Sequence, residues 1–557
     1  MEDRTGCPCN VHTATKFRQR RHLTALLFRC FQAAQGTVPA ENRPQVRERK
    51  RHLAFIREEC IITGNTSGNK AGMNPDTLQG RKNTFMNQKQ SGSGAGKRGG
   101  HPSGIDMLHS SITDKLILFA LPVILGSILQ QVFNAADTAV VGRFASSQAL
   151  AAVGGNASTI SLLINFFVGI TSGAGVVTAT CIGRGDEKRI SSAVHTAMLF
   201  SLFCGIFLAF LGQAAARPLL ILMASPEDVI DLATVYLKIY FTGMPFLLVY
   251  NMGASILRSA GDTRRPLLSL LAAGVLNVIL NLIFVIRFQM SVTGVALATV
   301  ISNGVNALLV LQFLLTEEGP LKLEPKKLGI DRETLAEILK IGVPSGLQGV
   351  VFSVSNVCIQ TAVNGFGSAV VAGSAVALNF EYMSYFAISG FIQACMNFTG
   401  QNYGAGQKGR LKKIYVMSLI CGVLSCMLLN YGFYFSRGFL LRLFSQDPGV
   451  LAVAEERMRA VLLFQSLAAT YEIAGSSLRG MGYSMQPAVL TVFGSCLFRI
   501  LWILSIFRAW PTLTVLFSVY PASWLLTGAL VTAAWFKTAL PKMSEGGGSK
   551  TEPGASA

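Results

Sequence analysis

The residue with the clearest chemical potential is Asp137, a carboxylate in the second half of an apolar run from Lys115 to Gly142. On a helix, Gln130, Asn134 and Asp137 fall at i, i+4 and i+7, so their side chains share one polar stripe. A charge near the middle of a membrane costs roughly 2.5–3.5 kcal/mol even on lenient insertion scales. An intramembrane aspartate is therefore a functional-site hypothesis, and the alternative is a carboxyl group that only hydrogen-bonds a neighbouring helix.

Three more ionisable residues lie inside apolar stretches: Glu381, Glu472 and Arg499. Each glutamate either lines a cavity that attracts a cationic substrate or pairs with a neighbouring backbone group or arginine, because unpaired charges inside a membrane are costly. For the same reason Arg499 requires a partner, and we expect an acidic one that the sequence does not identify.

The composition places all these residues in a membrane. The chain has 557 residues, of which 51% are hydrophobic and 14% are charged, whereas about 25% charged residues is usual in soluble domains. We expect an all-α integral membrane protein with about twelve spans, each near or above the roughly 20 residues that a bilayer requires. The predicted spans cover residues 115–141, 149–178, 190–213, 229–256, 266–287, 293–315, 335–363, 370–399, 412–435, 450–477, 487–508 and 511–537.

Lysine and arginine residues gather in alternate connectors between the predicted spans, at 184–189, 258–265, 322–332 and 408–413. By the positive-inside rule these connectors are cytoplasmic. Both termini are then cytoplasmic too, in a multi-pass protein of the plasma membrane.

The second half of the sequence repeats the first. LPVILGSILQQVFNAADTAVVG from Leu121 parallels VPSGLQGVVFSVSNVCIQTAVNG from Val343, CIGRGDEKR parallels QNYGAGQKGR, and LRSAGDTRRP parallels LRGMGYSMQP. Each half has an even number of predicted spans, so the halves are parallel repeats about an axis along the membrane normal. Two such bundles around a central cleft have the geometry of alternating access.

The repeat also defines the domains. We predict a first six-helix lobe at 105–315, a cytoplasmic linker at 316–334 and a second six-helix lobe at 335–538. Residues 1–104 are basic and rich in Gly and Ser, which is typical of a disordered tail, and residues 539–557 are predicted to form a second disordered tail.

Several motifs in order resemble the multidrug and toxic compound extrusion (MATE) family: the Asp-Thr pair in the first span, LRSAGDTRRP before the fifth, NVILN in the fifth, VTGVALATVIS in the sixth and QNYGAG after the eighth. The resemblance covers about residues 112–538. It implies two pseudo-symmetric lobes that form a V, and antiport of organic cations against protons or sodium.

The resemblance also implies a cation-coupling site in the first lobe, at Asp137, Asn277, Asn281 and Thr299. Periodicity agrees independently, because Asn277 and Asn281 share a helix face. Many family members have Asp where this chain has Asn281, so the site has one carboxylate fewer. Sodium, a hard cation, favours several charged oxygens, and we therefore predict proton coupling, with sodium at Asp137 as the alternative.

For the substrate cavity we expect contributions from Gln130, Asn134, Glu381 and Glu472. The substrates would be small cationic amphiphiles, exported by a monomer in membrane lipid without cofactor, resident metal or nucleic-acid partner. The alternative is a flippase for lipid-linked oligosaccharides, for which a more cationic cleft is expected. An enzyme is not expected, because HExxH, GxSxG and GxxxxGK[ST] motifs are absent from the sequence.

Overall fold

The computed structural model describes residues 104–222 and 227–544, and this part of the chain is helical throughout, without a β-strand. The predicted tails at 1–104 and 539–557 therefore lie outside the described residues, apart from Gly104 and residues 539–544, which belong to the last helix. The predicted linker between the lobes runs from the end of one long helix at Leu315 to the start of the next at Arg332.

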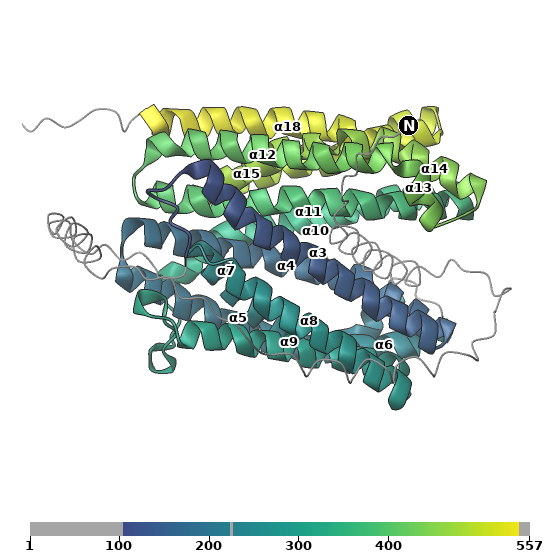
Figure 1. Ribbon diagram of the computed structural model, residues 1–557, viewed down its shortest axis with the longest axis horizontal. Helices are drawn as coiled ribbons and strands as arrows, with labels where there is room; N and C mark the ends of the chain where they lie inside the picture. The colour runs from purple at the N-terminus through teal and green to yellow at the C-terminus, as the bar shows by residue number, and fades with distance from the viewer. Residues whose placement is uncertain (1–103, 223–226, 545–557) are drawn as a thin grey trace, which may run out of the picture. The chain divides into compact units, whose positions relative to one another are not determined.

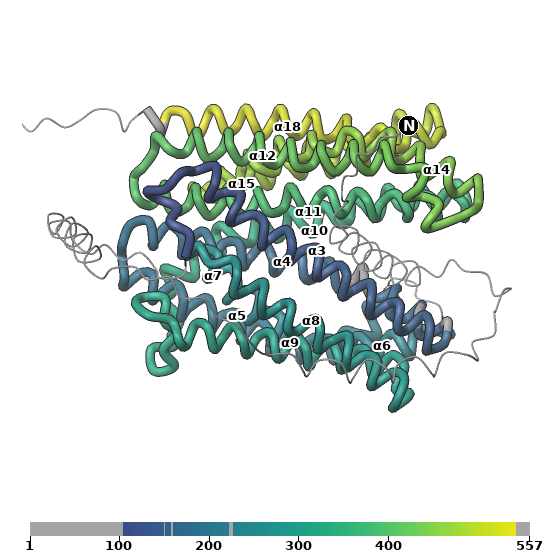
Figure 2. Tube along the Cα trace, viewed as in Figure 1, coloured from purple at the N-terminus to yellow at the C-terminus, as the bar shows by residue number. Residues whose placement is uncertain are grey.

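Each lobe is one continuous part of the chain, as the colour sequence in Figure 2 shows. The first lobe contains α3 (Ile112–Phe144), α4 (Ser147–Arg184), α5 (Glu187–Leu222), α6 (Glu227–Thr242), α7 (Met244–Ser259), α8 (Arg264–Leu282) with the π-helical η2 (Ile283–Arg287), and α9 (Ser291–Leu315). The linker contains η3 (Gly319–Leu321) and η4 (Pro325–Lys327). The second lobe contains α10 (Arg332–Asn364), α11 (Ser368–Gly404), α12 (Lys408–Phe435), α13 (Arg437–Leu440), η5 (Leu441–Leu443), α14 (Pro448–Ala460), η6 (Leu462–Leu467), α15 (Ala468–Gly480), α16 (Met485–Thr491), the π-helical η7 (Val492–Leu497), α17 (Phe498–Trp502), the π-helical η8 (Ile503–Phe507) and α18 (Leu513–Ser544).

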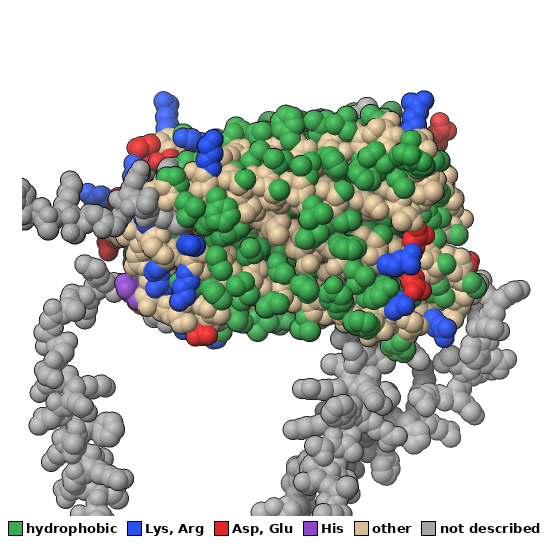
Figure 3. All heavy atoms as spheres, turned by 90° about the horizontal axis from the view of Figure 1, so that it is seen from above, with side chains coloured by type: hydrophobic (Ala, Val, Ile, Leu, Met, Phe, Trp, Pro, Cys, Tyr) green, Lys and Arg blue, Asp and Glu red, His purple; other side chains and the backbone are tan. Residues whose placement is uncertain are grey.

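Nine helices in the described ranges are long and apolar enough to cross a membrane, and α6 with α7 forms a tenth, bent by 47°. The predicted span at 229–256 is thus a broken one. The remaining two predicted spans correspond to α11, which contains Glu381, and to the interrupted α14, η6 and α15, in which α14 and α15 have 13 residues each. Figure 3 shows hydrophobic side chains over the middle of the molecule and charged side chains at its two ends. These features confirm the predicted fold class of about twelve helices in two lobes.

The first helix of each lobe begins in the core of the other lobe. Phe119 of α3 packs edge-on against Phe398 of the second lobe, with ring centroids 5.8 Å apart, whereas Val141 is buried in the first lobe. In the same way Ile338 of α10 is buried among first-lobe residues and Val363 in the second-lobe core. Figure 1 shows α3 crossing obliquely between the two sets of helices. A movement of one lobe is therefore transmitted to both ends of these two helices.

Glycines allow α4 to approach the second lobe at backbone distance. A Cβ atom on Gly169 would lie 2.2 Å from the backbone nitrogen of Gly346, and one on Gly183 would lie 2.0 Å from the carbonyl oxygen of Gln401. Real Cβ atoms do not come so close, so only glycine fits here. The lobes are consequently in tight contact from the middle of α4 to Arg184. We call the end of the molecule that carries Arg184 and the linker the basic end.

Candidate functional site

Asp137 lies in α3 beside the polar face of α8. The Asn281 side chain donates from Nδ2 to Asp137 Oδ1 at 2.5 Å, and Asn281 Nδ2 also lies 3.2 Å from Asn277 Oδ1. Both asparagines are buried. The structure thus brings together three of the four predicted cation-coupling residues in one hydrogen-bonded chain, with one carboxylate and two neutral amides.

The fourth predicted residue, Thr299 of α9, lies near Asp137, but its hydroxyl donates to the carbonyl oxygen of Val295 at 2.9 Å. Tyr236 and Tyr240 of α6 stack with ring centroids 6.2 Å apart and lie within electrostatic reach of Asp137. Sequence reasoning missed these tyrosines, although their i, i+4 spacing on a predicted span was an available signal. In the described residues, Asp137 forms no ion pair with a lysine or arginine.

A close approach of two helices positions the carboxylate. A Cβ atom on Gly274 of α8 would lie 1.8 Å from the ring of Phe133 on α3. Phe133 precedes Asp137 by one turn and Gly274 precedes Asn281 by two, so both pairs lie along the same helix contact. The π-helical η2 begins two residues after Asn281, at Ile283, and π segments within α-helices occur frequently at functional sites.

The other two polar residues predicted on α3, Gln130 and Asn134, are exposed. Neither side chain hydrogen-bonds to Asp137 in the described structure. Asn134 contributes its backbone carbonyl oxygen, which accepts from the Thr138 hydroxyl at 3.1 Å. Their predicted contribution to a substrate cavity stays a prediction.

Glu381 in α11 forms a buried ion pair with Arg457 of α14. The guanidinium donates from Nε to Oε1 at 2.7 Å and from Nη2 to Oε2 at 3.0 Å, and Nη1 donates to Ser374 at 2.7 Å. Gln465 donates to the backbone carbonyl oxygen of Glu381 at 2.8 Å. Of the two roles that the sequence left open for Glu381, this geometry favours the structural pair, because a bidentate arginine already neutralises the carboxylate.

Glu472 in α15 has a weaker partner. Arg479 Nη2 lies 3.8 Å from Glu472 Oε2, and the side chains are 10% and 15% exposed, respectively. Arg479 also donates from Nη1 to Gln348 of α10 at 3.3 Å. The longer distance leaves the carboxylate oxygens of Glu472 less fully satisfied than those of Glu381, so the drug-facing role stays open for Glu472.

Arg499 in α17 differs from the expectation, because its neighbours in the described part of the chain are neutral. It donates from Nε to Ser523 at 3.0 Å and from Nη1 to Asn356 at 3.1 Å. The guanidinium carbon lies 5.0 Å from the ring centroid of Phe352 and 4.8 Å from that of Tyr520. Aromatic faces attract a cation, which explains how Arg499 is buried without a carboxylate.

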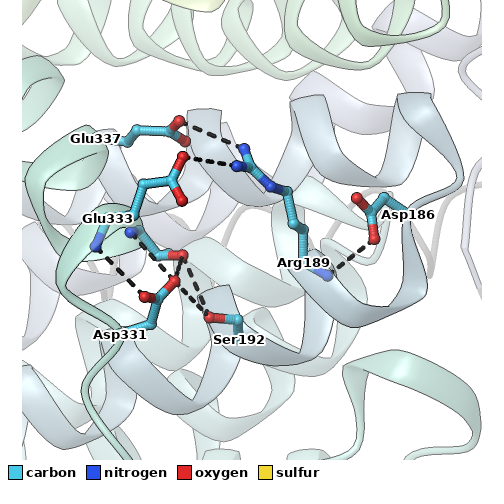
Figure 4. Close-up of polar contacts among 7 residues, drawn as sticks. Asp186, Arg189, Ser192, Asp331, Glu333 and Glu337 are labelled. Carbon is cyan, nitrogen blue, oxygen red and sulfur yellow. Dashed lines mark hydrogen bonds and ion pairs between the residues drawn. The ribbon is translucent and has the colours of Figure 1, made fainter.

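Polar contacts connect the two lobes at the basic end, as Figure 4 shows. Arg189 of α5 forms ion pairs with Glu333 at 2.8 Å and Glu337 at 3.5 Å, both on α10. Asp331 accepts from Ser192 of α5 at 3.1 Å and also caps α10 through the backbone N–H groups of Glu333 and Thr334. We call this set of contacts the basic-end clasp. It joins the start of the second lobe to α5.

This two-lobed fold of long apolar helices, in which polar centres lie inside the spans of each lobe, is that of a multi-pass membrane protein. The sequence model of the MatE family matches residues 122–283 and 344–503, one copy in each lobe. The chain belongs to this family, as the sequence motifs predicted.

Sequence relatives agree with this assignment, and a solved structure shares the fold. The chain is 29% identical over 396 residues to the probable multidrug resistance protein YoeA of Bacillus subtilis, covering 69% of this chain and 84% of the relative. It is 28% identical over 409 residues to the probable multidrug resistance protein YpnP of the same organism, covering 73% and 90%. A solved structure described as the outward-facing conformation of a multidrug resistance MATE family transporter of the MOP superfamily superposes with a TM-score of 0.73 at 21% identity, covering 80% of this chain and 98% of that one.

Proposed function

We propose that this protein exports organic cations across the plasma membrane in exchange for protons, with its basic end and both termini in the cytoplasm. The observation that carries the proposal is Asp137, a carboxylate inside a membrane span whose hydrogen-bonding neighbour, Asn281, is neutral. The names of YoeA and YpnP, both probable multidrug resistance proteins, support drugs as the cargo.

The charge of Asp137 provides a means of coupling. When ionised, the carboxylate has no basic partner in the described residues and attracts an organic cation. When protonated, it loses that attraction, so proton and drug compete for one group through a linked conformational equilibrium. Because α3 begins in the second-lobe core and carries Asp137 in the first, repacking around the carboxylate would change the contact between the lobes. This is the linkage that alternating access requires.

The composition of the centre supports protons over sodium as the coupling ion. Its single carboxylate, Asp137, lies beside the neutral amides of Asn281 and Asn277. Sodium is a hard cation that favours several charged oxygens, whereas a proton needs only the one carboxylate. The alternative function, a lipid-linked oligosaccharide flippase, is expected to have a cleft rich in Lys and Arg. The acidic Asp137, which has no basic partner in the described residues, does not support that alternative.

Inverted membrane vesicles test the proposal. A pH gradient without sodium should drive ethidium uptake into vesicles that contain the wild-type protein, and Asp137→Asn should abolish it at equal expression. Asp231→Asn is the matched control, because this aspartate is exposed and pairs with Arg217 away from α3. Asn281→Asp should increase any response to a sodium gradient. Transport that follows sodium and ignores pH would overturn the proton assignment, and no ethidium transport under either gradient would overturn the export function.

A further inference from the structure

The second lobe contains a buried cation that no carboxylate in the described residues neutralises. Arg457 is paired with Glu381, and Arg479 with Glu472. Arg499 remains. It is 1% exposed, and its Nη2 atom has no hydrogen-bond partner. A buried guanidinium nitrogen without an acceptor forfeits a charge-assisted hydrogen bond, so this atom is available for an additional acceptor.

Arg499 and its two partners come from the same three spans of their lobe as the Asp137 centre does in the first lobe. Asp137, Asn281 and Thr299 come from the first, fifth and sixth spans of their lobe. Asn356, Arg499 and Ser523 come from the equivalent spans α10, α17 and α18 of the other. The repeat therefore carries two centres of opposite charge, one with an uncompensated carboxylate and one with an uncompensated guanidinium.

Arg499 also lies at a break in regular helix geometry and next to an exposed polar residue. The π-helical segments η7 and η8 directly precede and follow α17, as η2 directly follows α8 in the first lobe. Asn356, which accepts from Arg499, is exposed. Ser353, one turn earlier on α10, accepts from Asn165 of α4 at 3.1 Å, so this face of α10 is directed toward the first lobe.

We propose that Arg499, together with Asn356 and Ser523, binds the carboxylate group of transported substrates. The protein would then export zwitterionic compounds as well as simple cations, with the cationic part of the substrate near Asp137 and the carboxylate at Arg499. This inference rests on the proposed export function and specifies its substrate class.

The chemistry of the centre suits a carboxylate. A guanidinium presents N–H groups in a planar fork that matches the two oxygens of a carboxylate. Nη2 is free, and Nη1 holds only the neutral Asn356 amide, which a charged acceptor would displace. Phe352 and Tyr520 cover the faces of the guanidinium, which leaves its edge for in-plane contacts and excludes water from the faces.

Two dyes that differ only at a carboxylate provide the test. Rhodamine 123 is a cationic methyl ester, and rhodamine 110 is the corresponding zwitterion with a free carboxylate. Proteoliposomes of the full chain should export both under a pH gradient. Arg499→Gln should reduce rhodamine 110 export at least tenfold and change rhodamine 123 export less than twofold, and Arg499→Lys, which keeps the charge without the fork, should fall between. Arg442→Gln is the matched control, because it removes an exposed arginine from the same lobe.

A competition measurement on the wild-type protein makes the test independent of variant folding. Benzoate should inhibit export of rhodamine 110 and spare that of rhodamine 123. Three results would overturn the carboxylate site without contradicting the export function. The wild-type protein exports only rhodamine 123, the well-folded Arg499 variants lose export of both dyes equally, or benzoate inhibits export of both dyes. If the wild-type protein exports neither dye, the export function itself is contradicted.

Discussion

Removal of the Glu381 carboxylate should destabilise the second lobe strongly. In Glu381→Gln, the Arg457 guanidinium stays buried at 1% exposure but loses its counter-charge. Breaking a buried, hydrogen-bonded ion pair by removing one partner costs about 3–5 kcal/mol. At roughly 2–4 °C per kcal/mol for a unit of about 200 residues, the melting temperature should fall by about 6–20 °C.

The assay is thermal unfolding of the purified protein in detergent, followed by tryptophan fluorescence. Glu472→Gln is the matched comparison, and its shift should be less than half as large, because the partner of Glu472 is 3.8 Å away. The double variant Glu381→Leu with Arg457→Met should recover most of the loss, since an apolar pair replaces the buried charges. Equal shifts for Glu381→Gln and Glu472→Gln, or a stable Glu381→Gln variant with altered drug preference, would refute the structural assignment of Glu381.

Three further predictions concern helix contacts and the basic-end clasp. Gly274→Ala should add a methyl group that clashes with the Phe133 ring. The overpacking should lower the free energy of unfolding by about 1–3 kcal/mol and reduce proton-driven export, measured in inverted vesicles. Arg189→Gln should loosen the clasp and speed hydrogen exchange at the start of α10 relative to Lys188→Gln. Hydrogen bonds from Thr334 and Ser192 hold the pKa of Asp331 below its usual value. The contribution of the ionised Asp331 to the stability of the clasp is therefore present at neutral pH and is lost only as the pH falls through that lowered pKa. Protection of residues 332–336, corrected for intrinsic exchange rates, should be equal at pH 7 and pH 5.

The features that could be predicted from sequence are those that depend on periodicity along one helix. The i, i+4 spacing of Asn277 and Asn281 correctly indicated a shared face. The family motifs then aligned that face with Asp137, which accepts a hydrogen bond from Asn281 in the structure. The repeat of Pro122 at Pro344 likewise located the equivalent first helices of the two lobes.

The features that could not be predicted depend on how helices are rotated and displaced relative to one another. Hydropathy does not predict that Arg457 contacts Glu381. Both residues lie near the starts of spans that run in the same direction, so their similar depth in the membrane was a signal that could have indicated the pair. The expected acid beside Arg499 was replaced by two aromatic faces and neutral oxygens, a solution that charge matching alone does not consider. The break at Gly243 was hidden within a continuous apolar run.

The central claim is that drug and proton compete for Asp137, and drug-induced proton release tests it most directly. Ethidium is added to the purified protein in weakly buffered detergent solution, at a pH at which a substantial fraction of the Asp137 carboxyl groups is protonated. A pH-sensitive dye reports the released protons. The wild-type protein should release protons in proportion to bound ethidium, and Asp137→Asn should bind ethidium more weakly without releasing any. Ethidium binding without proton release by the wild-type protein, or undiminished release by Asp137→Asn, would contradict the account.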